Sequence, residues 1–535
     1  MNMKKIFIYT AILAIVATAC SKLENEPVQE GKDPNEVKMI TEKVSGNVEP
    51  SSKATIADAD AAFSWTTGDD IAVHVSNGET SKFVFTSDAG AQGASTTGAS
   101  ASFTVVYEEG YSRDAFAVYP STIVTAESYN TGTSTLTVNL PATYTLAKVT
   151  GETTPCPMIA ENTPGSGWEF KQLCGLLRLT VNGIPSEATG MVIQFPGKKV
   201  NGDFSIVSPN PGTSTIATGI PVAGEDKITV TFAAGNTSAT VNIPLPTGTY
   251  DDVYITPIGT ETKVAAVRHI NGASYTAARK HGKKITTTMV AFSVGASKKV
   301  VFAPGNLWAT SNSGTNWTWS FAPYQYSRIG NATANTAING KGSVSTDGTV
   351  DLFGFSTSNT SYGIWNDKTA SNYSGVFDEW GKNNIGGYSA NEWGTLSGDE
   401  MTYLLNTRGG DNYAKVNFNF QDGIKGIIIF PDGFVWDNST MGDKPDNINV
   451  SASSFSDGTI SSRSNWNNIE SAGAVFLPVA GYRNGTSVSQ PTNYGYYWLS
   501  NGQVLYFRSD LKGDYVKLDS HDRYYGHSVR LVRVL

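Results

Sequence analysis

The uneven distribution of tryptophan is the sequence feature that most restricts how this chain can fold. Nine of its eleven Trp residues lie beyond residue 290, whereas residues 50–290 consist mostly of short segments in which polar and apolar residues alternate. The stretch Lys298–Leu307 (KKVVFAPGNL) stands at this change, and we interpret it as the first strand of a separate module. A chain of 535 residues is also too long for one core, which indicates about three domains.

The composition indicates a folded, mainly β protein that is not expected to bind nucleic acids. Hydrophobic residues make up 39% and charged residues 16% of the chain, as in globular proteins, and its 54 Gly with abundant Ser and Thr favour strands and turns. The net charge is -8, and removal of the basic start with Lys4 and Lys5 would bring it to -8 - 2 = -10. Such a charge argues against a nucleic-acid partner, which would need a broad basic face.

Residues 1–19 have the pattern of an export signal. The basic start Met1–Lys5 precedes the apolar run Ile6–Ala19, which is shorter than the roughly 20 residues that span a bilayer. The small residues before Cys20 resemble a bacterial lipobox, which predicts lipid attachment to Cys20 and an outer-membrane anchor. The alternative is an ordinary secretory signal with an incidental cysteine. Residues 20–50 are polar and charged, and we expect them to form a flexible tether.

Two further cysteines, Cys156 and Cys174, remain after the signal. Both lie in apolar, strand-like surroundings, and outside the cytoplasm such a pair can form a disulfide if neighbouring strands bring the two together. A pair of buried free thiols is the equal alternative.

Residues 51–290 predict two tandem antiparallel β-sandwiches, at 51–165 and 166–290. Expected strands of the first include Ser102–Tyr107, Ala115–Tyr119 and Ser134–Leu140. We expect the second to begin near Phe170 and to end with the strand at Gly282–Ile285. Short strands at this spacing, separated by turn residues, are typical of sandwiches.

Four motifs in this region resemble those of the fimbrillins, the subunits of type V pili. They are FSWTTGDDIAV (63–73), DAFAVYP (114–120), FKQLCGLLRLTV (170–181) and DFSI (203–206). The resemblance implies two transthyretin-like β-sandwiches, export as a lipoprotein, and assembly by strand exchange. In that family a surface protease cuts after a basic residue and removes the first strand, and the opened groove accepts the C-terminal strand of another subunit.

The cleavage implied by this resemblance would have to use a lysine, because no Arg precedes Arg113. Lys53 stands between the polar segment and the first apolar stretch, and is therefore the predicted processing site. Lys43 is the alternative.

Residues 291–535 resemble the major-paralogous-domain proteins, which share the C-type-lectin-like fold. The resemblance is clearest in GYYWLS (495–500) and YGHSVRLV (525–532), and it implies an α+β domain with Trp498 and Val529 facing inward and Arg530 in a buried polar contact. Ser397–Arg408 predicts a short helix, because Ser397 can cap it and apolar residues recur at helical spacing.

No constellation of residues predicts catalysis. The enzymes of the lectin-like fold work through cysteine, and residues 291–535 contain none. We therefore predict no catalytic, metal-ligating or cofactor-binding residue in this chain. Exposed aromatic side chains could stack on sugars, and the better candidates lie in expected loops: Trp365, Tyr373, Tyr388 and Tyr494.

Together these features predict an accessory or tip subunit of a type V pilus at the cell surface. It would accept a donor strand from a shaft subunit and present the C-terminal module as an adhesin head for a glycan or protein ligand. The alternative hypothesis is a lipid-anchored surface protein that binds such a ligand but never enters a pilus. An enzyme is not expected.

Overall fold

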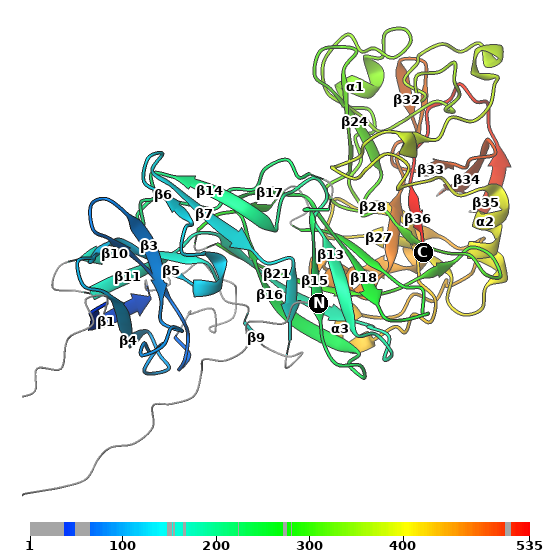
Figure 1. Cartoon of the computed structure of the whole chain (residues 1–535). Coiled ribbons are helices and arrows are strands. Elements are labelled where there is room, and N and C mark those ends of the chain that lie inside the picture. The colour runs from blue at the N-terminus through cyan, green and yellow to red at the C-terminus, as the bar shows by residue number, and fades with distance from the viewer. Residues whose placement is uncertain are drawn as a thin grey trace, which may run out of the picture.

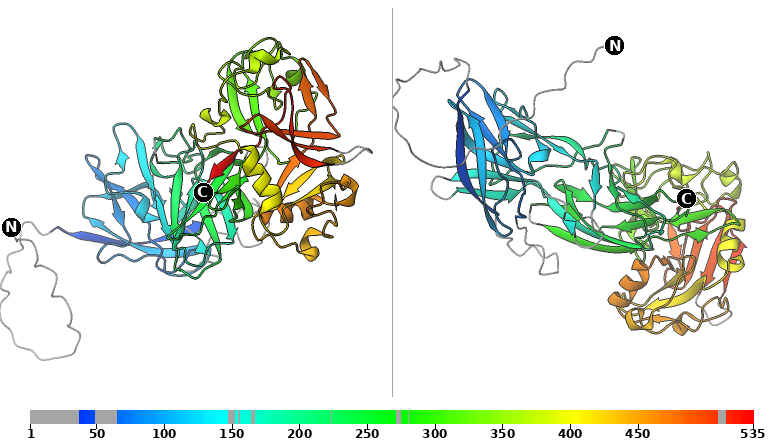
Figure 2. Two further views of the ribbon diagram at one scale, coloured as in Figure 1. Left: turned by 90° about the vertical axis from the view of Figure 1, so that its right-hand side faces the viewer. Right: turned by 60° about the horizontal axis from the view of Figure 1, so that its bottom comes forward.

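The computed structural model describes residues 37–48, 65–146, 152–153, 156–163, 167–222, 224–270, 275–279, 281–508 and 515–535. The strands gather into three successive parts, which follow one another from blue to red in Figure 1 and in both views of Figure 2. Two parts are β-sandwiches and the third mixes short strands with short helices and long loops. The mainly β character predicted from the sequence is confirmed.

The first sandwich is built on a seven-stranded sheet in the order β3-β2-β5-β10-β11-β1-β4. A three-stranded sheet, β14-β7-β6, packs against it. The strands of the large sheet are β1 (Met39–Val48), β2 (Ala72–Ser76), β3 (Ser81–Phe85), β4 (Ser100–Glu108), β5 (Ser112–Tyr119), β10 (Met158–Thr163) and β11 (Gly167–Gln172). Those of the small sheet are β6 (Tyr129–Asn130), β7 (Thr135–Leu140) and β14 (Gly202–Val207), and η1 (Ser121–Ile123) is a short 3-10 turn.

The large sheet buries apolar side chains on both of its faces. One cluster centres on Trp65, whose ring meets Phe103, Tyr119 and Phe170 edge-on at 4.9 to 5.1 Å between ring centres. The other cluster lies between the two sheets and includes Phe204 of β14. Because residues alternate between the faces of a strand, nearly continuous apolar strands such as Ala72–Ser76 fill both clusters.

The second sandwich pairs a four-stranded sheet, β21-β12-β16-β9, with a five-stranded sheet, β19-β18-β13-β15-β8. One cluster of buried aliphatic and aromatic side chains fills the space between them. The strands are β8 (Thr143–Thr145), β9 (Glu152–Thr153), β12 (Gly175–Asn182), β13 (Gly190–Gln194), β15 (Lys227–Thr231), β16 (Ser238–Leu245), β18 (Asp252–Ile258), β19 (Ala266–His269) and β21 (Gly282–Thr288), with β17 (Gly248–Tyr250) and β20 (Tyr275–Ala277) as a separate pair.

The predicted boundary between the sandwiches, 165/166, needs correction. Strand β11 (Gly167–Gln172) pairs with β10 and β1 and therefore belongs to the first sandwich. In the reverse sense, β8 pairs with β15 of the second sandwich, and β14 pairs with β7 of the first. The two sandwiches thus exchange strands across the predicted boundary, which alternation within single segments cannot reveal because pairing partners lie far apart in the sequence.

The C-terminal part, residues 291–535, combines short strands with short helices and long loops, and its likeness to C-type lectins stays a prediction. Its sheets are β22-β23-β36, β25-β24-β26, β29-β27-β28-β30, β31-β32 and β33-β34-β35. The strands are β22 (Phe292–Ser293), β23 (Lys299–Phe302), β24 (Leu307–Ser311), β25 (Trp317–Phe321), β26 (Thr349–Val350), β27 (Tyr413–Phe418), β28 (Ile424–Ile429), β29 (Thr459–Ile460), β30 (Val475–Pro478), β31 (Tyr482–Asn484), β32 (Ser487–Ser489), β33 (Tyr494–Trp498), β34 (Gln503–Arg508), β35 (Val516–Ser520) and β36 (Val532–Val534). We call this part the head.

The helices of the head are short. They are α1 (Thr333–Thr336), α2 (Gly398–Thr402), α3 (Asn438–Met441) and α4 (Arg463–Ser471), with η2 (Ala370–Tyr373), η3 (Trp380–Lys382), η4 (Tyr403–Thr407) and η5 (Phe455–Asp457) as single turns. The predicted helix at Ser397–Arg408 is confirmed: Ser397 and Glu400 form a reciprocal capping box at the start of α2. Among the described residues, no helix combines the length and hydropathy needed to cross a membrane.

Candidate functional site

Strand β1 (Met39–Val48) is the element of the first sandwich that most clearly bears on function. It lies between β11 and β4, running antiparallel to β4 over nine residue pairs and parallel to β11 over three. Within the described ladder, β4 is joined to the rest of the sheet only through β1. Removing β1 would therefore leave a groove with unpaired backbone groups on both of its walls.

This position corrects the prediction that residues 20–50 form a flexible tether. Alternate residues of β1 face the core, and Val44 is only 6% exposed. The outward Lys43 and the half-buried Glu42, which lies on the same face as Val44, lower the mean hydropathy of the segment. The sequence therefore suggested a polar tether where the structure has a strand. Lys43, the alternative processing site, is an exposed residue of β1 opposite Thr104. Cys20 and Lys53, the predicted lipidation and processing sites, lie outside the described residues, so both stay predictions.

A glycine lets β1 sit close to the aromatic core. A Cβ atom built on Gly46 would lie 2.8 Å from one ring carbon of Phe103 and 3.2 Å from one of Phe170. The indole nitrogen of Trp65 donates a hydrogen bond of 3.0 Å to the carbonyl oxygen of Gly46. At Gly46 the rings of Phe103 and Phe170 leave no space for a larger side chain in the groove that β1 fills.

Polar contacts of β1 are few. The carboxylate of Glu42 forms an ion pair with the guanidinium of Arg113 on β5. Burial and the neighbouring carboxylate of Glu42 raise the pKa of Tyr107, so its phenol stays protonated. Burying one Val side chain contributes on the order of 1.5–3 kcal/mol. Among residues 39–47 of β1, Val44 is the one well-buried apolar side chain, whereas backbone hydrogen bonds run along both sides of the strand.

Cys156 and Cys174 lie side by side in the buried zone between the two sandwiches. Their sulfur atoms are 3.7 Å apart, and both cysteines are free thiols in this structure. The hydrogen bond with Cys156 and burial raise the pKa of the Cys174 thiol. The two cysteines thus lie next to each other, as a disulfide requires, and the disulfide itself stays a prediction.

In the head, the inward residues predicted from the late motifs lie where expected. Trp498 and Val529 are 1% and 0% exposed. The buried guanidinium of Arg530 donates to Asn306 Oδ1 at 3.2 Å and to Gln325 Oε1 at 2.9 Å.

The loop aromatics were predicted less well. Tyr373 and Tyr388, proposed as exposed, are buried, with exposures of 0% and 1%, because each ring packs against a tryptophan. Trp365 and Tyr494 are partly exposed. Among the described residues, no group of three or more His, Cys, Asp or Glu is placed to hold a metal ion.

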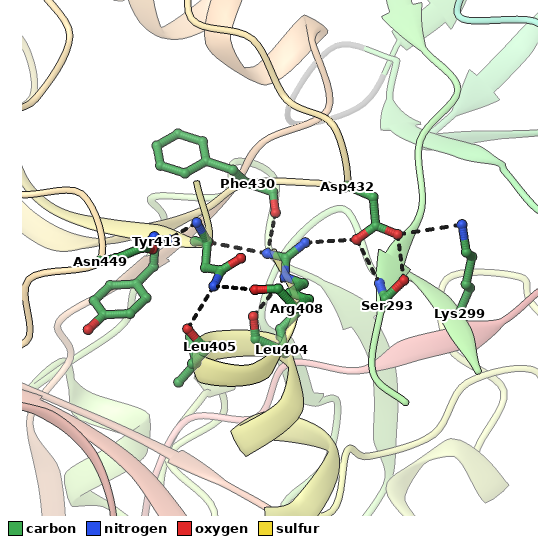
Figure 3. A network of polar contacts seen from close by, with 10 residues as sticks. Ser293, Lys299, Leu404, Leu405, Arg408, Tyr413, Phe430, Asp432 and Asn449 are labelled. Atoms are coloured by element: carbon green, nitrogen blue, oxygen red, sulfur yellow. Dashed lines mark hydrogen bonds and ion pairs between the residues drawn. The ribbon is translucent and has the colours of Figure 1, made fainter. Parts of the chain in front are cut away.

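A polar network fixes the start of the head to its centre (Figure 3). Asp432 accepts hydrogen bonds from the amide of Ser293 at 3.0 Å and from its hydroxyl at 2.7 Å. The nearly buried Arg408 pairs with the same carboxylate at 3.0 Å and also donates to the carbonyl oxygens of Leu404, Asn412 and Phe430. Burial raises the pKa of Asp432, but the bonds from Ser293 and Arg408 outweigh it and lower the pKa overall.

The head is also joined firmly to the second sandwich. Arg268 of β19 pairs with Glu470 of α4 at 2.8 Å, and Tyr254 of β18 lies in the same hydrophobic cluster as Trp319 and Trp393 of the head. The guanidinium of Arg533 stands 4.0 Å from the centre of the Tyr254 ring. These contacts make the second sandwich and the head one continuous body.

The last described strand, β36, is itself part of this body. It pairs antiparallel with β23 through Val300–Val534 and Phe302–Val532, and the amide of Leu535 donates to the carbonyl oxygen of Lys299 at 3.0 Å. Residues 532–535 are thus engaged within their own subunit.

No family model and no curated protein matches this chain. Among solved structures, it is similar to a candidate cell adhesion protein of Bacteroides ovatus, with 13% identity, a TM-score of 0.30, and coverage of 46% of this chain and 91% of that one.

Two fimbrial proteins are similar as well. The C-terminally truncated tip fimbrial protein Mfa3 of Porphyromonas gingivalis shares 13% identity at a TM-score of 0.22, over 44% of this chain and 82% of that one. A fimbrial protein of Bacteroides ovatus shares 10% identity at a TM-score of 0.23, over 92% and 99% of the two chains. At these scores the superpositions are loose.

Proposed function

We propose that this chain is a pilus subunit whose strand β1 is cut away and replaced by a strand from another subunit. The observation that carries the proposal is the position of β1, which is an inner strand between β4 and β11. A donated strand would restore both rows of backbone hydrogen bonds and cover the aromatic cluster around Trp65. The first sandwich is then complete both before and after the exchange.

The proposed place of the subunit is the tip or another accessory position. Residues 532–535 are hydrogen-bonded within the head and so are unsuited to be donated. The head is continuous with the second sandwich, so it would be displayed rigidly on a surface filament as a module that binds an extracellular glycan or protein.

Export as a lipoprotein through Cys20 remains part of the proposal. A lipid-anchored surface protein that keeps β1 is the second candidate function. The observation that favours it is that β1 completes the first sandwich within a single chain.

The experiment that tests the proposal uses Lys53→Gln and Lys43→Gln in cells that assemble the pilus. Cleavage after Lys53 would separate the whole of β1 from the sandwich, whereas cleavage after Lys43 would split β1 in its middle. We expect Lys53→Gln to keep its lipidated start and to disappear from sheared filaments. Lys43→Gln, a matched loss of one lysine, should enter filaments normally. Equal incorporation of both variants, with β1 retained, would overturn the proposed strand exchange. Absence of the unaltered protein from filaments, with its lipidated start intact in the membrane fraction, would favour the anchored surface protein.

A further inference from the structure

We propose that the groove between the second sandwich and the head binds an acidic oligosaccharide, whose sugar rings carry carboxylate or sulfate groups. The inference rests on the proposed role of the head as an adhesin and specifies the ligand class and its site. It stands on the shape of the groove, the charge of its walls and one aromatic pair, of which Tyr324 is exposed and Tyr326 is buried.

The groove consists of two neighbouring hollows. The larger, of about 490 Å³, lies between strands β19 and β21 of the second sandwich and helix α4 of the head. The smaller, of about 390 Å³, lies on the head and includes Trp308 and Arg328 in its wall. Both hollows share Tyr324, Tyr326 and Arg463. Volumes of this order suit small-molecule ligands, whose sites measure about 300–1,000 Å³, and two hollows in succession suit a short chain of rings.

Positive charge dominates the larger hollow, although the whole chain carries a net charge of -8. Its walls contain Arg268, His269, Lys283, Lys284 and Arg463, against the single carboxylate of Glu470. Glu470 is already engaged with Arg268 at 2.8 Å. An anionic ligand is therefore the electrostatic complement of this wall.

The surroundings shift the pKa of two of these basic side chains, Lys283 and His269. Burial and the nearby guanidinium of Arg268 lower the pKa of Lys283, so an arriving anion would relieve a repulsion between like charges. Burial lowers the pKa of His269, but its ion pair with Asp252 and its bond to the carbonyl oxygen of Ala322 outweigh this and raise it overall. His269 is thus held in its cationic form more firmly than a free imidazole.

An aromatic pair stands where the two hollows meet. Tyr324 is 39% exposed and lies parallel to Tyr326, with ring centres 5.0 Å apart and 5° between the planes. Arg463 donates to the hydroxyl of Tyr326 at 2.7 Å and to Gln421 Oε1 at 3.0 Å, and its guanidinium carbon lies 5.8 Å from the centre of the Tyr324 ring. The ring of Tyr324 is therefore held by stacking on Tyr326, next to the guanidinium of Arg463, which two hydrogen bonds keep in place.

This combination favours a sugar over an acidic peptide. The C–H face of a sugar ring packs on an aromatic plane while its acidic substituent reaches a neighbouring cation, so each ring can use Tyr324 and the basic wall together. An extended acidic peptide would use the charges but needs no aromatic plane. The experiment separates these two cases.

Titration calorimetry on the purified full chain tests the inference with four probes: oligogalacturonate, a heparin-derived hexasaccharide, a neutral maltohexaose and a short polyglutamate. The variants are Tyr324→Ala and Lys284→Gln. Their matched controls are Tyr515→Ala and Lys444→Gln. Tyr515 is 44% exposed, the ammonium of Lys444 pairs with Asp411, and neither residue lines the groove.

We expect binding of one or both acidic oligosaccharides, weakened by salt, and a loss of affinity of about tenfold or more in each groove variant but in neither control. Preference for oligogalacturonate would identify carboxylate as the recognised group, and preference for the hexasaccharide would identify sulfate. The inference is overturned if maltohexaose binds as well as the acidic sugars, if polyglutamate binds more tightly than either, or if the controls lose as much affinity as the groove variants.

The same variants separate this inference from the proposed function. Tyr324 lies in the head and Lys284 on β21 of the second sandwich, so both groove variants should enter sheared filaments as the parent does. A parent that binds the acidic sugar but never enters filaments would refute the pilus role alone. A parent that enters filaments but binds no acidic sugar would refute the ligand assignment alone.

Discussion

Replacing Gly46 by valine should loosen β1 without disturbing the rest of the first sandwich. The new Cβ would fall 2.8 Å from the ring of Phe103 and 3.2 Å from that of Phe170, and the rings cannot withdraw easily because both pack against Trp65. Overfilling a packed core typically costs about 1–3 kcal/mol. Since each 1.4 kcal/mol is a factor of ten, the population with β1 detached should rise by roughly 5- to 150-fold.

Hydrogen exchange followed by mass spectrometry measures this directly. Amides of β1 and of its partner β4 should exchange faster by that factor, because local opening governs their exchange. Amides of β10, which pairs with β5 and β11, should keep their rates. Thr41→Val is the matched control, because it places valine on the exposed face of the same strand.

Equal exchange rates of the β1 amides in Gly46→Val and Thr41→Val would contradict this prediction. Equal acceleration in β1 and β10 would contradict it as well, because β1 would then open only together with the rest of the sheet.

Three further predictions concern the head and the cysteines. Arg408→Met should lower the free energy of unfolding of the head by about 3–5 kcal/mol, because three buried carbonyl oxygens lose the donor that Arg408 supplies and Asp432 keeps only its more distant cation, Lys299 at 3.6 Å. Thermal unfolding monitored by tryptophan fluorescence would report the loss, and no change in midpoint would contradict this. Burial lowers the pKa of both His521 and His527, whose ring nitrogens lie 2.8 Å apart, so the unfolded chain binds more protons and this pair should stabilise the head fully above pH about 6.5 and progressively less below it. Comparing melting points at pH 8 and 5 with those of His521→Asn isolates this contribution, and equal pH dependence in both proteins would disprove it. The two buried cysteines, Cys156 and Cys174, should form a disulfide under mild oxidation, seen as the loss of two hydrogens in the intact mass. An unchanged mass, with both thiols alkylated after unfolding, would show that they stay reduced.

The fold was predictable wherever a segment carries its own signal. The alternation of polar and apolar residues predicted strands such as Ser100–Glu108 and Thr135–Leu140. The spacing of Ser397 and Glu400 predicted the start of a helix, which the capping box confirms. Strand exchange between the sandwiches could not be foreseen, because β14 finds its partner more than sixty residues earlier, at β7, and register at such distances depends on the assembled core.

The candidate site followed the same rule. The charged residues of Met39–Val48 suggested a tether, and only the pairing with β4 and β11 shows a strand. The groove beside Tyr324 escaped notice because its cations come from β19, β21 and α4, which the sequence keeps almost 200 residues apart at the extreme: Arg268 and Arg463 differ by 463 - 268 = 195 positions.

The central claim is that β1 is exchanged for a donated strand, and the first residue of the protein in sheared surface filaments tests it most directly. Mass spectrometry of filament-associated material should find chains that begin after Val48, with Ala54 as the expected first residue following cleavage at Lys53. Filament-associated chains that still carry Met39–Val48 would contradict the account. So would a protein found only in the membrane fraction with its lipidated Cys20 intact, which would leave the anchored surface protein as the function.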